Sequence, residues 1–195
     1  IYRPFLARAG QQEGLSFINP SLVESVLFSA GGFDAKYGDK LSSVMDVYYK
    51  DPRKFNAGFT ASFLGASAFV QDTINWRSNY IFGARYQTNS YLLGALDTKG
   101  EYKPVFVDIQ GMYNRYFNEN TRLTLYGSYA NNKYRIQPQN RETNWGSINE
   151  ALRFTVFYEG QEVTQFETFL GAASVEQRLK KNKLKLTYVT SIFRT

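Results

Sequence analysis

The sequence predicts an all-β protein, a transmembrane antiparallel β-barrel of which about seven strands are present. Runs of about ten residues alternate between apolar and polar side chains through most of the chain, which is typical of strands with two different faces. The 15 Tyr, 16 Phe and 2 Trp occur in a chain whose mean hydropathy is −0.41, as expected where aromatic girdles and a polar interior share the same strands. No stretch approaches the ~20 continuous apolar residues of a membrane helix, so we expect any crossing of a membrane to use strands.

The first predicted element is a hairpin near the N-terminus. Residues 22–28 and 41–49 are runs rich in strand-forming residues. Gly31, Gly32 and Gly38 lie in the turn between them and allow backbone conformations that other residues avoid. We expect the two runs to pair with each other and to lie inside the barrel wall instead of forming part of it.

The predicted wall begins after a break at Pro52, because proline cannot donate a hydrogen bond to a strand ladder. We therefore divide the chain into residues 1–50 and residues 51–195. The clearest alternation follows directly at residues 55–63, where phenylalanine and alanine face small polar residues. Gly65 then permits a tight reversal into the next strand.

Further strands are predicted at residues 66–73, 79–88, 105–116, 123–129, 163–177 and 183–193. Their connections alternate in length, with short polar turns at residues 76–78, 118–120 and 180–182 and long loops at residues 89–103 and 137–151. Outer-membrane barrels have short periplasmic turns and long extracellular loops. We therefore expect the chain to enter its first wall strand from the periplasmic side.

The alternation also assigns side chains to the two faces of the predicted wall. On the lipid face we expect Phe55, Phe59, Phe63, Phe82, Val107, Ile109, Leu123 and Leu125. The lumen-facing candidates are Arg85, Asp108, Gln110, Asn114 and Tyr126. We expect these side chains to contact the N-terminal segment, ahead of any role in substrate passage. No face is assigned to residues 163–177, because Phe166 and Leu170 alternate out of phase with Phe169 and Val175.

The composition excludes several classes of enzyme and of metal site. Cysteine and histidine are absent, so a thiol nucleophile, a histidine general base and a Cys/His zinc site are excluded within this sequence. We predict no catalytic residue, no metal site and no cofactor, and we do not expect an enzyme. The net charge is +6, but the cations are scattered along the chain, so nucleic acid is not an expected partner.

A motif near the N-terminus connects this pattern with a known family. It comprises Gly14-Leu15-Ser16-Phe17-Ile18-Asn19-Pro20, Gly32-Phe33, Ala35, Tyr37-Gly38 and Leu41-Ser42-Ser43-Val44. This segment closely resembles the end of the plug domain of TonB-dependent outer-membrane receptors, and most of all the Bacteroidota type. The family usually places an Asp-Gly pair shortly before the Asn-Pro segment, and residues 1–10 contain none. The resemblance is specific over residues 14–50, whereas the remainder matches as a succession of barrel strands.

The resemblance implies that residues 1–50 are the C-terminal part of a plug domain and that residues 51–195 are the first strands of a larger barrel. It implies a structural role for the motif residues, which are Gly31, Gly32, Phe33, Tyr37, Gly38, Ser42 and Ser43. Because the sequence has neither a start methionine nor a signal peptide, we expect it to be part of a larger protein.

The resemblance also implies a function, that of a receptor and transporter that takes up an extracellular ligand across the bacterial cell outer membrane. The implied partners are membrane lipid and a periplasmic TonB-type energy-coupling protein, which would act through a segment absent from this chain. A surface lipoprotein is a further candidate partner. The ligand class is left open between an iron chelate, a glycan, a peptide and a cobalamin.

Two alternatives remain open at this point. A receptor-like barrel could have lost transport and could serve as a structural scaffold in a larger outer-membrane assembly. A small complete barrel of the adhesin or porin type would instead treat residues 1–50 as an appendage. The second alternative predicts an even number of strands and a closing strand, and the sequence shows neither.

Overall fold

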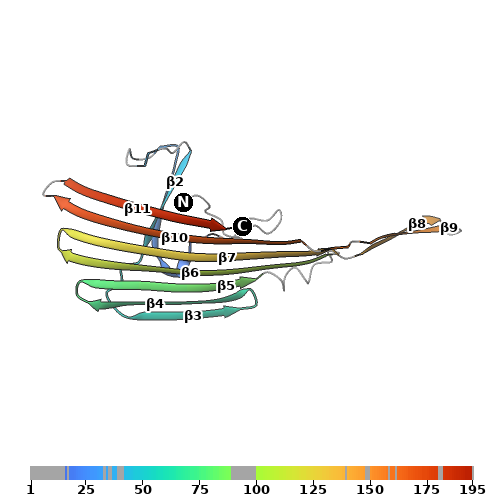
Figure 1. Ribbon diagram of the computed structural model, residues 1–195, viewed down its shortest axis with the longest axis horizontal. Helices are drawn as coiled ribbons and strands as arrows, with labels where there is room; N and C mark the ends of the chain where they lie inside the picture. The colour runs from blue at the N-terminus through green and yellow to red at the C-terminus, as the bar shows by residue number, and fades with distance from the viewer. Residues whose placement is uncertain are drawn as a thin grey trace.

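Strands make up almost all of the structure, and they pair in an antiparallel manner (Figure 1). The computed structural model describes residues 16, 18–32, 34, 37–38, 42–88, 100–138, 140–147, 150–157, 159–160, 162–179 and 182–194. Within these ranges the predicted all-β class is confirmed, and no helix is long and apolar enough to cross a membrane. The elements are η1 (Pro20–Leu22), β1 (Val23–Ala30), β2 (Ser43–Tyr49), β3 (Asn56–Ser62), β4 (Gly65–Asn75), β5 (Ser78–Thr88), β6 (Gly100–Asn118), β7 (Thr121–Pro138), β8 (Arg141–Ser147), β9 (Glu150–Val156), β10 (Glu162–Leu179) and β11 (Asn182–Arg194).

The largest unit is a seven-stranded sheet, which we call the main sheet. Its strand order is β11-β10-β7-β6-β5-β4-β3, so most neighbours in space are also neighbours in sequence. The main sheet therefore has the seven strands that the sequence predicted, and its place in a barrel wall stays a prediction. Within the described residues, β3 and β11 each have one neighbour, and the sheet is open at both edges.

Tight turns join most of the neighbouring strands. Trp76 and Arg77 connect β4 to β5, and Glu119 and Asn120 connect β6 to β7, close to the predicted positions. At the other end of the sheet, Gly65 follows the turn between β3 and β4 with a φ of +139°, and a Cβ there would collide with the backbone of β5. Only glycine fits this position, so the predicted reversal at Gly65 is confirmed.

The two expected long loops differ from the prediction. Strand β7 continues to Pro138 and pairs there with Gly100 of β6, so residues 100–103 belong to a strand. The predicted loop at 137–151 includes β8 and the first residues of β9, which pair as a separate hairpin that Figure 1 shows beyond one end of the main sheet. The error arose because polar composition was read as a loop, whereas exposed strands at the end of a long ladder are also polar. Residues 89–99 and the turn residues 180 and 181 lie outside the described residues.

The register gives the main sheet two different faces, because directly opposed residues of an antiparallel pair point to the same side. One face is apolar across all seven strands and carries Phe59, Val70, Phe82, Ile109, Leu125, Phe169 and Leu186. The opposite face is mainly polar and carries Thr60, Gln71, Arg85, Asp108, Ser128, Ser174 and Thr187. The eight residues expected on the lipid side share the alternation of the apolar face.

The register also assigns the strand whose faces the alternation left undecided. Phe169 lies opposite Tyr129 and Val175 lies opposite Leu123, so both belong to the apolar face. Phe166 and Leu170 then lie on the polar face. Neighbouring strands therefore settle an orientation that β10 does not show by itself.

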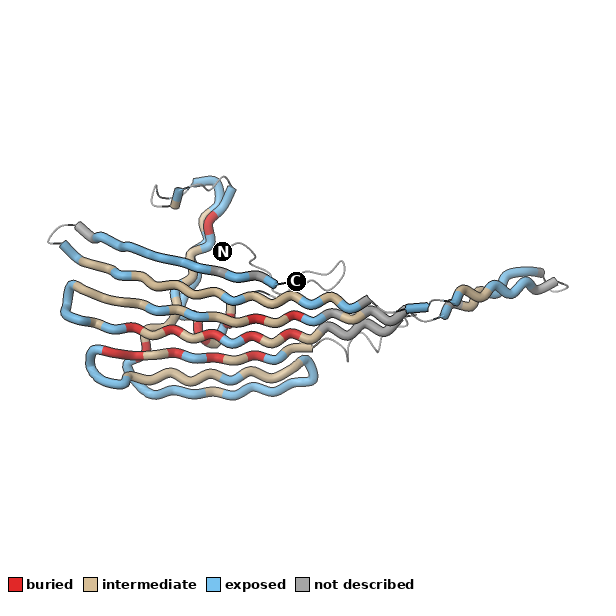
Figure 2. The backbone as a smooth tube through the Cα atoms, viewed as in Figure 1, coloured by how far each residue is buried: buried red, intermediate tan, exposed pale blue. Residues whose placement is uncertain are grey.

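The N-terminal hairpin forms a separate two-stranded sheet. Strands β1 and β2 pair from Val23 with Tyr49 to Ala30 with Ser43, so the predicted pairing is confirmed. In Figure 1, β2 crosses the strands of the main sheet at a steep angle. Buried residues gather on β5, β6 and β7, as Figure 2 shows, and their centre is an apolar cluster of Leu22, Ile81 and Met112. The interior of the molecule thus lies where the N-terminal segment meets the polar face.

Candidate functional site

The candidate site is the contact between the N-terminal segment and the polar face of the main sheet. We call residue 16 together with residues 18–22 the strap. All five lumen-facing candidates lie on the polar face, where Arg85, Asp108, Gln110 and Asn114 are buried and Tyr126 is half-buried. Whether this face lines a lumen stays a prediction.

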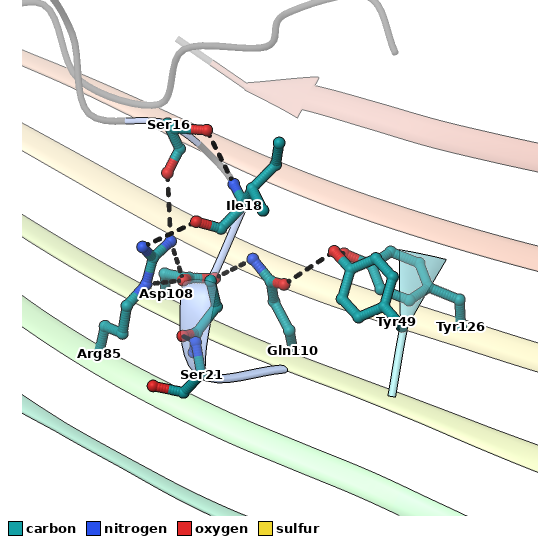
Figure 3. A network of polar contacts seen from close by, with 9 residues as sticks. Ser16, Ile18, Ser21, Tyr49, Arg85, Asp108, Gln110 and Tyr126 are labelled. Carbon is teal, nitrogen blue, oxygen red and sulfur yellow. Dashed lines mark hydrogen bonds and ion pairs between the residues drawn. The ribbon is translucent and has the colours of Figure 1, made fainter. Parts of the chain in front are cut away.

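Arg85 and Asp108 join the sheet to the strap (Figure 3). They occupy directly opposed positions on β5 and β6, where Arg85 Nε donates to Asp108 Oδ2 at 2.6 Å. The remaining guanidinium nitrogens donate to the backbone of the strap, Nη1 to the carbonyl of Ile18 at 3.0 Å and Nη2 to that of Ser16 at 3.2 Å. A planar guanidinium has five N–H donors, so one side chain can bind a carboxylate and two carbonyls together. Arg85 therefore holds the strap while Asp108 balances its charge.

The network continues from Asp108 to the end of β2. Gln110 Nε2 donates to Asp108 Oδ1 at 2.9 Å, and the Tyr49 hydroxyl donates to Gln110 Oε1 at 3.2 Å. The hydroxyls of Tyr49 and Tyr126 lie 3.3 Å apart, and their ring centroids lie 5.4 Å apart (Figure 3). Burial raises the pKa of the Tyr49 hydroxyl, so this group remains a proton donor at neutral pH. We call Arg85, Asp108, Gln110 and Tyr126 of the main sheet the latch network. It contacts the strap through Arg85 and β2 through Tyr49.

An apolar contact lies beside the latch network. Leu22 is buried against Ile81 and Met112, and Asn19 caps η1 by accepting a hydrogen bond from the backbone N–H of Ser21 at 3.1 Å. A Cβ atom at Gly83 would lie 2.9 Å from Asn19 Nδ2 and 3.0 Å from Leu22 Cδ2. Glycine at this position of β5 therefore permits the close approach of η1 to the sheet.

A second polar network fixes the linker between β2 and β3. Asp51 Oδ1 accepts from Asn79 Nδ2 at 2.7 Å, and Asp51 Oδ2 accepts from the Tyr116 hydroxyl at 2.6 Å. The carbonyl of Pro52 accepts from the Thr73 hydroxyl at 3.0 Å. These contacts attach the linker to β4, β5 and β6.

Asn114 belongs to the second network. Its Nδ2 donates to Asn79 Oδ1 at 2.9 Å, and its Oδ1 accepts from Arg122 Nη2 and from the Thr124 hydroxyl, both at 2.9 Å. The structure therefore divides the five candidates. Arg85, Asp108, Gln110 and Tyr126 lie together in the latch network, whereas Asn114 supports the linker.

The motif glycines and serines shape the end of the β1–β2 hairpin. Gly31 has a φ of +80°, a conformation that favours glycine, and its N–H donates to the carbonyl of Ser42 at 3.2 Å. The carbonyl of Gly32 accepts from the Ser29 hydroxyl at 2.8 Å. Ser43 begins β2 opposite Ala30.

The aromatic part of the motif has a different environment. The Tyr37 hydroxyl donates to Asp46 Oδ2 at 2.6 Å, which connects the turn to β2. A Cβ at Gly38 would meet no atom within 4 Å, so packing does not require glycine there. Phe33 lies outside the described residues.

Among the described residues, no group of three or more acidic, histidine or cysteine side chains could hold a metal ion.

Sequence reasoning missed Tyr49, Asp51, Asn79 and Gly83. A glycine on the inner face of a strand is a signal of close approach, and a carboxylate beside the break at Pro52 is a weaker one. Tyr49 had no local signal, because its partner Gln110 is 61 residues away in the chain. Such contacts are known only once the two segments are placed against each other.

The comparisons with known proteins add no relative. No family model matches the chain, and neither a curated protein nor a solved structure matches it.

Proposed function

We propose that the chain is the plug-to-barrel part of a TonB-dependent receptor, which takes up an extracellular ligand across the bacterial outer membrane. The observation that carries this proposal is the division of the main sheet into an apolar face and a polar face, with the N-terminal segment bound to the polar one. The motif in residues 14–50 is the basis for the choice of this family, because it resembles the end of the family's plug domain. The two-faced sheet agrees with a membrane wall that surrounds a plug.

The exposure of the apolar face supports a location in lipid. Phe59 and Phe63 are 74% and 82% exposed, and Phe82, Ile109, Leu125 and Phe169 are exposed as well. Contiguous apolar patches on soluble proteins rarely exceed a few hundred Å². Seven strands at about 4.8 Å spacing carry this surface over a width of roughly 30 Å. Strands of 11 residues such as β4 and β5 are long enough to cross a bilayer at a tilt.

The chemistry of the strap supports a plug that can move. Its contacts with the sheet are mainly hydrogen bonds, and its apolar contact centres on the single side chain of Leu22. Water can replace hydrogen bonds when the strap leaves, whereas separation of a large apolar interface would be far more costly. A force that pulls on the chain before residue 16 would act first on the hydrogen bonds that Arg85 donates to Ser16 and Ile18. The linker at Asp51 would keep the hairpin attached to the wall.

Energy-dependent accessibility of the strap tests the proposal without knowledge of the ligand. Leu22 is buried, and the sequence contains no cysteine, so Leu22→Cys introduces one thiol into this part of the protein. We expect a maleimide to label this thiol in energised cells, and we expect labelling to fall after a protonophore or after deletion of the TonB-type partner.

The outcomes separate the candidate functions. Labelling that is independent of energy, in a protein that resists alkaline extraction from the outer membrane, would contradict transport and favour the scaffold. Recovery of the protein in the soluble fraction would contradict both functions. Ser16→Cys provides the matched control, because residue 16 is already exposed and its labelling should not depend on energy.

A further inference from the structure

One end of the main sheet carries exposed cations next to exposed aromatic rings. It is the end with the Trp76–Arg77 turn, and β3 also begins there. We call the following set the basic rim: Arg53, Lys54, Trp76, Arg77, Arg115 and Phe117. All six side chains are exposed, with Trp76 at 81%.

The two central cations of the basic rim are neighbours. Arg115 of β6 lies directly opposite Ser78, which follows Arg77 in the chain. The Arg115 guanidinium reaches the Ser78 hydroxyl at 3.5 Å, and the Tyr113 hydroxyl donates to the same oxygen at 3.3 Å. The Arg115 guanidinium and two hydroxyls therefore come together on adjacent strands, and Arg77 lies in the turn directly before Ser78. Guanidinium and hydroxyl donors suit a phosphate group.

The basic rim is held in place by its backbone and by ring contacts. The carbonyl of Arg77 accepts a hydrogen bond from the N–H of Tyr116 at 2.7 Å, and the N–H of Arg77 donates to Asn75 Oδ1 at 2.9 Å. The guanidinium of Arg77 lies 3.9 Å from the centre of the Trp76 ring. Arg115 lies 5.9 Å from the centre of the Phe117 ring. Arg77 is therefore presented from a hydrogen-bonded turn, and Arg115 from the paired strand β6.

The charge of the basic rim and the apolar surface beside it indicate which kind of ligand could bind there. Within the described residues at this end, the exposed carboxylates are Glu24 and Glu119, fewer than the four exposed cations of the basic rim. Arg115 and Phe117 belong to the apolar face, which continues from them to Leu125 and Phe82. A ligand that meets both surfaces needs an anionic head and an apolar body.

We propose that the basic rim binds the phosphate group of anionic phospholipids in the leaflet that contacts the short-turn end of the sheet. The inference rests on the proposed function, because it requires the apolar face to lie in a bilayer. Trp76 and Phe117 occupy the boundary between headgroups and acyl chains, where aromatic side chains are favoured. The cations then extend toward the phosphates, as lysine and arginine do near membrane surfaces.

The preference for an anionic lipid can be measured by electron spin resonance. The full-length protein is reconstituted in phosphatidylcholine that contains spin-labelled phosphatidylglycerol or spin-labelled phosphatidylcholine. We expect the wild-type protein to retain the labelled phosphatidylglycerol preferentially. A cation near an anionic surface contributes about fivefold in affinity at low salt, so Arg77→Gln/Arg115→Gln should lose most of this preference. High salt should weaken the preference of the wild-type protein as well.

The matched control lies at the opposite end of the same face. Lys133→Gln/Arg194→Gln removes two exposed cations from the apolar face far from the basic rim and should leave most of the preference intact. An integral protein without a preference for phosphatidylglycerol, or an equal loss in both variants, would overturn this inference and leave the proposed function standing. A protein that alkaline carbonate extracts from the bilayer would overturn both.

Discussion

Replacing Arg85 by methionine should open the strap. Arg85 is 8% exposed, and its guanidinium donates to the carbonyls of Ile18 and Ser16, at 3.0 and 3.2 Å. A hydrogen bond to a charged group contributes about 1.5–3 kcal/mol, and water recovers part of this when the strap leaves. We therefore expect a net loss of ~3 kcal/mol, which corresponds to a roughly 100-fold rise in the population of the open strap.

The same substitution also affects the main sheet, and a second variant separates the two effects. Asp108 is 0% exposed, so removing its partner leaves a buried charge and should destabilise the main sheet by about 3–5 kcal/mol. Arg85→Met/Asp108→Leu removes that charge and should restore most of the stability of the main sheet. The strap should remain open in both variants, because neither retains the donor to its carbonyls.

Hydrogen exchange followed by mass spectrometry provides the assay for both effects. Peptides that cover residues 16–22 report on the strap, and peptides from β5 and β6 report on the main sheet. Arg115→Met is the control, because Arg115 is an exposed arginine on the opposite face of the sheet. Unchanged exchange of the strap in an inserted Arg85→Met protein would refute the role of Arg85. Full recovery of strap protection in the double variant would refute it as well.

Three further predictions concern the faces and the contacts of the sheet. Phe59→Arg should impair membrane insertion by ~2–4 kcal/mol in a two-state folding titration, whereas Thr60→Arg on the polar face should insert normally; equal effects would contradict the face assignment. Gly83→Ala should push η1 from the sheet and lower the free energy of strap opening, measured by hydrogen exchange, by about 1–3 kcal/mol. Gly127→Ala is the control and should leave this free energy unchanged, because a Cβ there meets open space. Tyr49→Phe removes the hydroxyl that joins β2 to the latch network and should lower the free energy of unfolding by about 1 kcal/mol in the two-state folding titration. An unchanged free energy of unfolding would show that this contact does not stabilise the protein.

Much of the main sheet could be predicted from local features of the chain. The alternation at residues 55–63 and the glycine at position 65 identified β3, β4 and the turn between them, because side-chain direction in a strand has a period of two residues. The same argument placed Arg85 and Asp108 on one face. It failed for β10, where apolar residues occur on both faces, and for residues 137–151, where an exposed hairpin is as polar as a loop.

The sequence by itself determined the all-β class, the N-terminal hairpin and the division of most strands into an apolar and a polar side. These properties depend on neighbouring residues, whose spacing is visible in one dimension. Only the tertiary structure decided that Arg85 binds Asp108 and the strap, that Asn114 supports the linker and that Gly83 makes room for η1. Those contacts join segments up to 69 residues apart, as between Arg85 and Ser16. Their partners depend on the strand register and on the position of the strap against the sheet, which many residues determine together.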